Sequence, residues 1–203
     1  MRIEASELDA QRSYRLITGL VVPRPIAWVS TQSEAGLVNL APFSAFTFVS
    51  PKPPMLAISV GHKAGVYKDT ARNILATEEF VVHIADHALM EAVHYSAKEY
   101  PSDVSEVEAL GLETIASDKI KPPRIAGAPV AMECRFRQCI EFGDTRSRLI
   151  VGEVLVFHVR DGLVNDGKVE TRELDPIARL AGPNYARVGE ITTLRPIFQT
   201  PKQ

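Results

Sequence analysis

Two long runs with the composition of β-strands follow one another in the second half of the chain, at residues 130–142 and 148–160. The pair Gly143–Asp144 stands between them, and both residue types favour tight turns. The two runs are therefore expected to form one antiparallel hairpin. A hairpin of this length indicates that antiparallel strands, rather than packed helices, dominate the fold.

Shorter segments of strand and helix character precede and follow this hairpin. Runs rich in β-branched and aromatic residues predict strands at 25–31, 38–41, 44–50, 54–60, 79–84 and 188–191. Helical spacing of apolar residues predicts short helices at 6–20, 71–76, 86–96 and 106–112, with one helical turn at 175–180. No repeat or change of composition divides the chain. The sequence predicts one mainly β domain over residues 1–203, an antiparallel barrel with a few short peripheral helices.

Charge and hydropathy exclude several classes of partner. The chain has 23 Lys and Arg residues against 25 Asp and Glu residues, a formal charge of −2. A nucleic-acid-binding domain would show a basic excess, so no nucleic-acid partner is expected. The apolar runs are far shorter than a membrane-spanning helix, and the first residues lack the apolar stretch of a secretory signal. No membrane association is expected, and the expected location is the cytoplasm.

Two cysteines, Cys134 and Cys139, lie five residues apart in the first strand of the predicted hairpin. An odd offset places their side chains on opposite faces of a strand, so a disulfide is not expected. Cys134 is interpreted as a buried strand residue rather than as a redox thiol.

The remaining polar clusters have ordinary interpretations. The spacing His87–Glu91–His94 suits one helical face, but partly exposed polar residues on an amphipathic helix give the same pattern, and no metal site is predicted. The acidic stretch 103–108 is interpreted as a solvated face. No Gly-x-Gly-x-x-Gly, phosphate-binding Gly/Lys loop or Gly-x-Ser-x-Gly motif occurs in the sequence.

Hydroxyl side chains and turns concentrate in the first third of the chain. Ser30 and Thr31 end one predicted strand, and Pro42 is expected to make the next strand deviate because proline cannot donate a ladder hydrogen bond. Further on, Lys68 and Thr70 stand at the start of a predicted helix, where backbone N–H groups and one positive charge can bind an anion. A flat heteroaromatic ring with a phosphate would satisfy both parts. The alternative is that these residues only cap a helix and end strands.

At this point the sequence resembles a known family. Eight segments, in order and at similar spacing, resemble the flavin reductase-like family of FMN-binding split barrels: 23–31, 39–44, 68–74, 80–84, 122–124, 133–134, 152–154 and 175–180. The resemblance implies a split β-barrel of Greek-key type, a homodimer, and non-covalently bound FMN, with FAD less favoured. It covers nearly the whole chain.

The resemblance also implies which residues hold the flavin. The ring and ribityl chain would be lined by Ser30, Thr31, Asn39, Ala41, Pro42, Phe43 and Ser44. The tail and phosphate would be held by Ser59, Val60, Gly61, Lys68, Asp69, Thr70 and Asn73. Trp28 is either a ring that stacks on flavin or a residue of the core or the dimer interface.

By the same resemblance, the expected reaction is hydride transfer from NAD(P)H to bound flavin, with no catalytic side chain assigned because the reactivity belongs to the cofactor. Some members carry a histidine shortly before the segment matching Gly152, but residues 145–151 contain none. Arg146 or Arg148 is a candidate for a cofactor phosphate instead. Two alternatives stay open: an FMN-binding electron carrier or flavin store without productive nicotinamide binding, and an enzyme that reduces an organic substrate directly. An electron-acceptor protein or a flavin-dependent monooxygenase is the expected partner.

Overall fold

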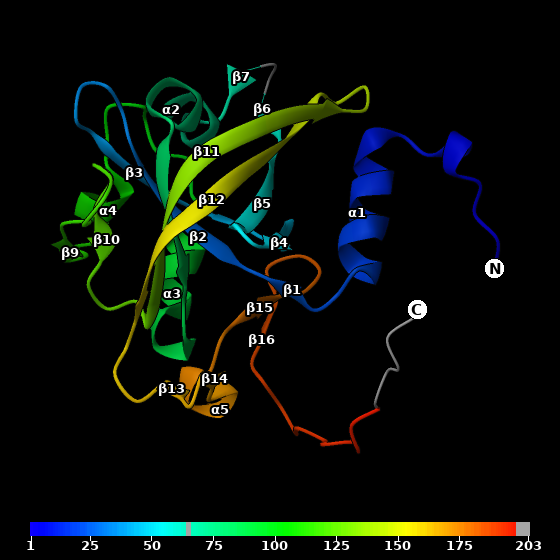
Figure 1. The fold of residues 1–203 in the computed structure, drawn as a ribbon. Coiled ribbons are helices and arrows are strands. Elements are labelled where there is room, and N and C mark those ends of the chain that lie inside the picture. The colour runs from blue at the N-terminus through cyan, green and yellow to red at the C-terminus, as the bar shows by residue number, and fades with distance from the viewer. Residues whose placement is uncertain (64–65, 198–203) are drawn as a thin grey trace, which may run out of the picture.

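The computed structural model describes residues 1–63 and 66–197, which are built around one seven-stranded antiparallel sheet (Figure 1). Its long central hairpin spans nearly the residues expected from the sequence. In spatial order the strands are β3 (Val38–Phe43), β2 (Ala27–Gln32), β8 (Glu79–Ile84), β11 (Val130–Phe142), β12 (Ser147–Val159), β5 (Pro54–Val60) and β4 (Phe46–Pro51).

The sheet curls because consecutive strands occupy its opposite edges. The edge strands β3 and β4 are separated in the chain only by Ser44 and Ala45. The backbone N–H of Ser59 on β5 donates to the carbonyl of Ala45 at 2.8 Å, which extends the β4–β5 pairing into this link. Two edges joined by so short a link cannot lie far apart, so the sheet closes on itself as a barrel. The expectation of a mainly β, antiparallel barrel is confirmed.

The β11–β12 hairpin lies between β8 and β5, although both of those strands precede it in the chain. This crossover is of the Greek-key kind. The pairing of β11 with β12 shifts register between Glu133 and Cys134 and between Phe136 and Gln138, and the Phe80 side chain of β8 reaches across to Gly152 on β12. A Cβ atom at Gly152 would lie 2.3 Å from Cζ of Phe80, so only glycine fits beneath this ring.

Helices and small ribbons surround the barrel. The helical segments are η1 (Ala5–Glu7), α1 (Ala10–Leu20), α2 (Asp69–Thr77), η2 (His87–Leu89), α3 (Met90–Tyr95), α4 (Glu106–Ala109) and α5 (Thr171–Leu174). The short strands are β1 (Arg24–Pro25) with β15 (Ala178–Arg179) and β16 (Tyr185–Ala186), β9 (Thr114–Ile115) with β10 (Arg124–Ile125), β13 (Val164–Asn165) with β14 (Lys168–Val169), and β6 (His62–Lys63) with β7 (Val66–Tyr67).

Several expected boundaries differ from the observed ones. The first long helix begins at Ala10 rather than near Ser6, because the Asp9 side chain accepts the backbone N–H of Arg12 and caps it. The expected helical turn at 175–180 is wrong, since part of this segment pairs with β1 as strand β15. The strand expected at 188–191 is also absent from the described chain.

Two buried residues settle points left open by the sequence. Trp28 is fully buried in the core, and its Nε1 donates to Oγ of Ser96 at 2.9 Å. Cys134 is also fully buried, and burial raises the pKa of its thiol. The interpretations of Trp28 as a core residue and of Cys134 as a buried strand residue are confirmed.

The expectation that the strand deviates at Pro42 is wrong. Strand β3 continues through this residue, and Pro42 pairs in register with Trp28. The missing N–H is tolerated because β3 is an edge strand, where one face of the backbone has no ladder partner. No helix in the described part of the chain is both long and apolar enough to cross a bilayer.

Candidate functional site

A cavity of about 640 Å³ lies beside strand β3, the β6–β7 ribbon, the start of α2 and the segment after α3. Six of the residues expected to contact a cofactor line it: Asn39, Ala41, Pro42, Lys68, Asp69 and Thr70. They were expected from the family resemblance, and the local sequence signal beside it was a polar strand segment and a helix start. The structure brings these two elements together around one opening.

The start of α2 supplies the charged end of this cavity. Lys68 occupies the N-cap position, and because a lysine side chain carries no acceptor it makes no capping hydrogen bond to the first backbone N–H groups. The Nζ atom of Lys68 lies 5.7 Å from the centre of the Phe43 ring. Asp69 forms an ion pair with Arg72, which compensates its negative charge. The positive end of the helix dipole and the Lys68 ammonium group suit an anion, while Glu99 and Glu106 line the same cavity.

Two hydrogen bonds between side chains join α2 to the sheet. Nδ2 of Asn39 donates to Oγ1 of Thr70 at 2.9 Å, and Nδ2 of Asn73 donates to Oγ1 of Thr31 at 3.1 Å. Thr31 and Asn73 are buried behind the cavity wall. These bonds fix the helix start against β2 and β3, so the position of the anion-binding groups is set by the barrel itself.

The other expected residues lie elsewhere. Ser30 is buried on the opposite face of β2 from Thr31, and its hydroxyl donates to the carbonyl of Pro123 at 2.7 Å. Neighbouring strand residues point to opposite faces, so Ser30 and Thr31 cannot both face one ligand. Phe43 and Val60 belong to the apolar core, Ser44 lines a second cavity, and Ser59 and Gly61 do not line the cavity beside α2.

Glu106 was missed, because the acidic stretch around it was interpreted as a solvated face. Instead Glu106 is buried, lines the cavity, and accepts the backbone N–H of Leu40 at 2.9 Å through Oε2. Burial raises the pKa of this carboxyl, while the bond from Leu40 partly opposes the rise. The carboxyl satisfies an edge-strand N–H that would otherwise lack a partner. Nothing in the local sequence signals this long-range contact.

Aromatic and basic side chains close the other end of the cavity. The His62 ring lies 4.4 Å from that of Tyr67, and its buried Nδ1 has no hydrogen-bond partner among the described residues. The Arg148 guanidinium lies 3.5 Å from the centre of the Tyr67 ring. Arg146 instead bonds to Glu141 at the tip of the β11–β12 hairpin. Of the two arginines considered for a cofactor phosphate, only Arg148 contacts a wall of this cavity.

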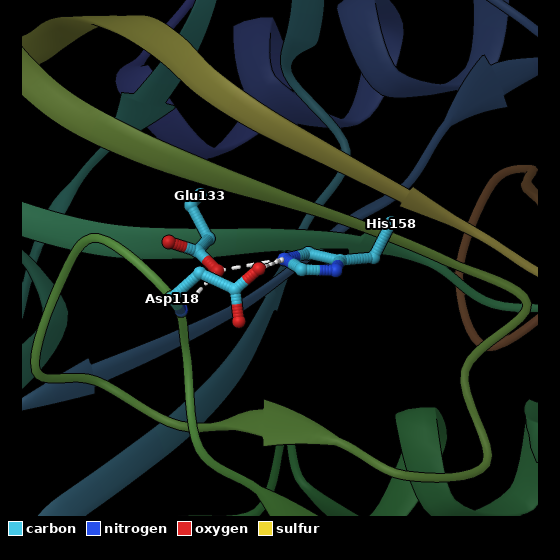
Figure 2. Close-up of side chains that lie close together, drawn as sticks. All are labelled: Asp118, Glu133 and His158. Carbon is cyan, nitrogen blue, oxygen red and sulfur yellow. Dashed lines mark hydrogen bonds and ion pairs between the residues drawn. The ribbon is translucent and has the colours of Figure 1, made fainter.

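A second polar cluster, Asp118, Glu133 and His158, lies on another part of the barrel (Figure 2). Their ligand atoms lie within 4.8 Å of one another, a spacing compatible with a metal ion. However, the carboxylate of Glu133 already accepts the backbone N–H groups of Asp118 and Lys119, each at 2.7 Å, and Nε2 of His158 at 2.6 Å. Burial alone would raise the pKa of Glu133, but these hydrogen bonds lower it. The cluster is a saturated structural contact.

Further bonds of the same kind hold the whole 117–125 segment against the sheet. Glu79 accepts the backbone N–H of Lys121 at 2.8 Å, and His83 accepts that of Ile125 through Nε2 at 3.0 Å. The Nδ1 atom of His83 lies 2.8 Å from the carbonyl of Trp28 and donates to it. Burial lowers the pKa of His83 to about 4, which keeps the ring neutral.

Comparison with known proteins agrees with this architecture. Residues 19–172 match the model of the flavin reductase like domain. Nitrilotriacetate monooxygenase component B from Bacillus cereus is similar in structure with a TM-score of 0.92 at 38% identity, covering 96% of this chain and 98% of that one. For 2-nitrobenzoate 2-nitroreductase NbaA from Pseudomonas fluorescens, the TM-score is 0.89 at 35% identity, with 100% and 99% covered.

A protein with a split barrel domain from Shewanella frigidimarina shares the fold at a TM-score of 0.85 and 19% identity, covering 96% of this chain and 98% of that one. The expected split-barrel fold is thereby confirmed. The family match covers most of the barrel, including strands β2 to β12 and the start of α2. By sequence and by structure, the chain belongs to the flavin reductase-like family.

Proposed function

We propose that this protein is an FMN-dependent oxidoreductase that accepts hydride from NAD(P)H, a flavin reductase. The observation that carries the proposal is the cavity at the start of α2, where an uncapped helix N-terminus and Lys68 adjoin the polar edge strand β3. FMN, when bound, supplies a ring that accepts and releases two electrons. A site for it needs an anion-binding end and a flat polar wall, and this cavity provides both.

The residues present fit this group. The helix start with Lys68 and Thr70 would bind the phosphate, and Asn39 and Ala41 on β3 would lie along the ring. The buried Nδ1 of His62 has no partner among the described residues, which supports a ligand in the cavity, since buried polar atoms in proteins are nearly always satisfied. Asn73 and Thr31 would fix the helix start from behind. The ion-paired Asp69 would lie at the helix start beside the phosphate. The other expected contacts would shape the strands around the site: Ser30, Phe43, Ser44, Ser59, Val60 and Gly61.

The chain's own part in the reaction is positioning. The barrel holds β3 and the start of α2 at fixed separation through the bond from Asn39 to Thr70. Fixed N–H donors favour a reduced, anionic ring because they need no reorganisation as charge develops. We assign no catalytic side chain to the chemical step.

The names of similar proteins support two roles for the reduced flavin. Nitrilotriacetate monooxygenase component B, by its name, works beside another component, which supports an electron-acceptor protein or a flavin-dependent monooxygenase as partner. The nitroreductase supports a second candidate function, direct reduction of an organic substrate at the same flavin.

We also propose that the protein is located in the cytoplasm.

We also propose a homodimer. Helix α1 stands away from the barrel (Figure 1) and buries none of its residues, although Tyr14, Ile17 and Leu20 are largely exposed. On the edge strand β4, Phe48 and Val49 are exposed as well. Such apolar surface is typical of an interface between subunits. Sedimentation should give twice 22.3 kDa, and an FMN-bound monomer would contradict the proposal.

The proposed function is tested by anaerobic reduction. The purified protein should bind FMN in preference to FAD, and NADH or NADPH should bleach the flavin band near 450 nm without oxygen. Reduction by dithionite, but by neither nucleotide, would replace the reductase with the electron-carrier alternative. Failure to bind added FMN at all would remove the flavin site altogether.

A further inference from the structure

A second cavity, of about 370 Å³, adjoins the first, since Pro42 and Ala97 line both. It lies between α1 and the small β1–β15–β16 sheet, which are neighbours in Figure 1. Its charged lining residues are two arginines, Arg24 and Arg179, and no Asp or Glu side chain lines it. The cavity next to the proposed flavin site therefore carries positive charge that no acidic lining residue balances.

The two arginines stand directly opposite one another in the small sheet. Arg24 on β1 pairs in register with Arg179 on β15, and Arg179 in turn pairs with Tyr185 on β16. This row places Arg24, Arg179 and Tyr185 along one wall of the cavity. Like charges directly opposite in a ladder are destabilising. Neither arginine has an acidic partner among the residues that the structure describes, so the chain itself does not relieve this repulsion.

The two guanidinium groups differ in how far their donors are used. Arg24 donates to the carbonyls of Thr18, Val21 and Leu180 and to Oγ of Ser44, which ties the C-terminal end of α1 to the small sheet. Arg179 donates through Nε to the carbonyl of Gly182 and through Nη1 to the hydroxyl of Tyr185. Its Nη2 donates to no described residue. Arg24 is thus a structural group, while Arg179 retains donors beside the cavity.

We propose that this cavity binds the anionic oxygen group of the second substrate, a carboxylate or phosphate attached to a planar ring, and that Arg179 is the residue that recognises it. Arginine presents paired N–H donors that match carboxylate and phosphate oxygens. Tyr14 and Tyr185 supply aromatic walls, and Pro42 and Ala97 line both this cavity and the proposed flavin cavity. The inference rests on the proposed function for its choice of second substrate, but the anion site itself does not require bound flavin.

The first test is calorimetric titration of flavin-free protein with benzoate and with benzamide, its neutral counterpart of the same shape. Benzoate should bind at least about tenfold more tightly, since hydrogen bonds to charged groups are the stronger ones. Arg179→Gln should abolish that preference, while Arg179→Lys should keep part of it. Arg137→Gln is the matched control, because Arg137 forms an exposed ion pair with Glu153 on the barrel hairpin. Equal affinity for benzoate and benzamide in the unaltered protein would overturn the proposal without any variant.

The second test identifies the source of the anion in FMN-loaded protein. Reduced nicotinamide mononucleotide and reduced nicotinamide riboside differ by one phosphate and serve as alternative electron donors. If the site takes the phosphate of the reductant, the mononucleotide should have an at least tenfold lower KM, and Arg179→Gln should remove the difference. If it takes the carboxylate of an aromatic acid, the two donors should be alike while benzoate still binds through Arg179. An unaltered preference in Arg179→Gln for both ligand pairs would overturn the assignment.

Discussion

The 117–125 segment and the cavity at the start of α2 both contact polar side chains of the central sheet. The two regions differ in whether the hydrogen-bonding groups there find partners within the chain. In the first, Glu133, His83, Glu79 and Ser30 are all matched by partners within the chain. In the second, Asn39 and Thr70 are bonded to each other beside a helix start whose N-cap residue, Lys68, makes no side-chain capping bond. The difference teaches that buried polarity alone does not mark a binding site. The proposed site differs in that its polar groups line an opening beside a helix start.

The largest effect, on the free energy of unfolding, is expected at Glu133, whose carboxylate is fully hydrogen-bonded within the chain. Glu133→Ala should lower the free energy of unfolding by about 3 to 5 kcal/mol, because it removes a buried carboxylate and leaves two backbone N–H groups and His158 without an acceptor. Glu153→Gln is the control, since Glu153 forms an exposed ion pair with Arg137 and should change stability by less than about 1 kcal/mol. Denaturant unfolding measures both. Equal losses would contradict the assignment of Glu133 as a buried contact on which the 117–125 segment depends.

Acid should act on the same region through His83. Its folded pKa, about 4, lies below the ordinary value of 6.5, so the folded state resists protonation. The stability that this group contributes is present above pH 6.5 and is lost as the pH falls toward 4, by about 3 kcal/mol in all. Thermal melts of His83→Gln across this range should show a shallower decline than the unaltered protein. Parallel declines would show that His83 does not carry this pH dependence.

The next effect is a change in the free energy of FMN binding at the cavity, and it is expected to be smaller than the two changes in unfolding free energy. Lys68→Ala combined with Thr70→Ala should weaken FMN binding at least about tenfold, because one charged and one hydroxyl contact to the phosphate are removed. Lys121→Ala is the control, a lysine whose observed bond is made by its backbone N–H. Fluorescence titration with FMN measures all three proteins. Unchanged affinity in the double variant would place the phosphate elsewhere.

The smallest effect is expected from Glu106, which belongs to the cavity wall. Burial raises the pKa of its carboxyl, so the folded state favours the protonated form, and the stability that this group contributes declines as the pH rises through its folded pKa. Glu106→Gln resembles the protonated form and can still accept the backbone N–H of Leu40. Its free energy of unfolding at pH 7 should stay within about 0.5 kcal/mol of the unaltered protein. A loss of several kcal/mol would show that the ionised carboxylate is required.

Elements with strong local patterns could be predicted from the sequence, whereas contacts between distant segments could not. The β11–β12 hairpin, strand β5 and helix α2 carry strong local periodicity, and they lie within one or two residues of expectation. The helix start at Lys68–Thr70 was likewise a local signal. Contacts between distant segments carry no such signal: the bond from Glu106 to Leu40 and the pairing of β1 with β15 depend on the closed barrel. Ser30 was grouped with Thr31 because they are neighbours, although strand geometry places them on opposite faces.

We propose that the cavity at the start of α2 recognises a flavin through its phosphate. The most direct test is to titrate flavin-free protein with FMN and with riboflavin, which has the same ring but no phosphate. We predict that FMN binds at least about tenfold more tightly than riboflavin and that the Lys68→Ala, Thr70→Ala variant binds the two alike. Equal affinity of the unaltered protein for FMN and riboflavin would contradict the claim.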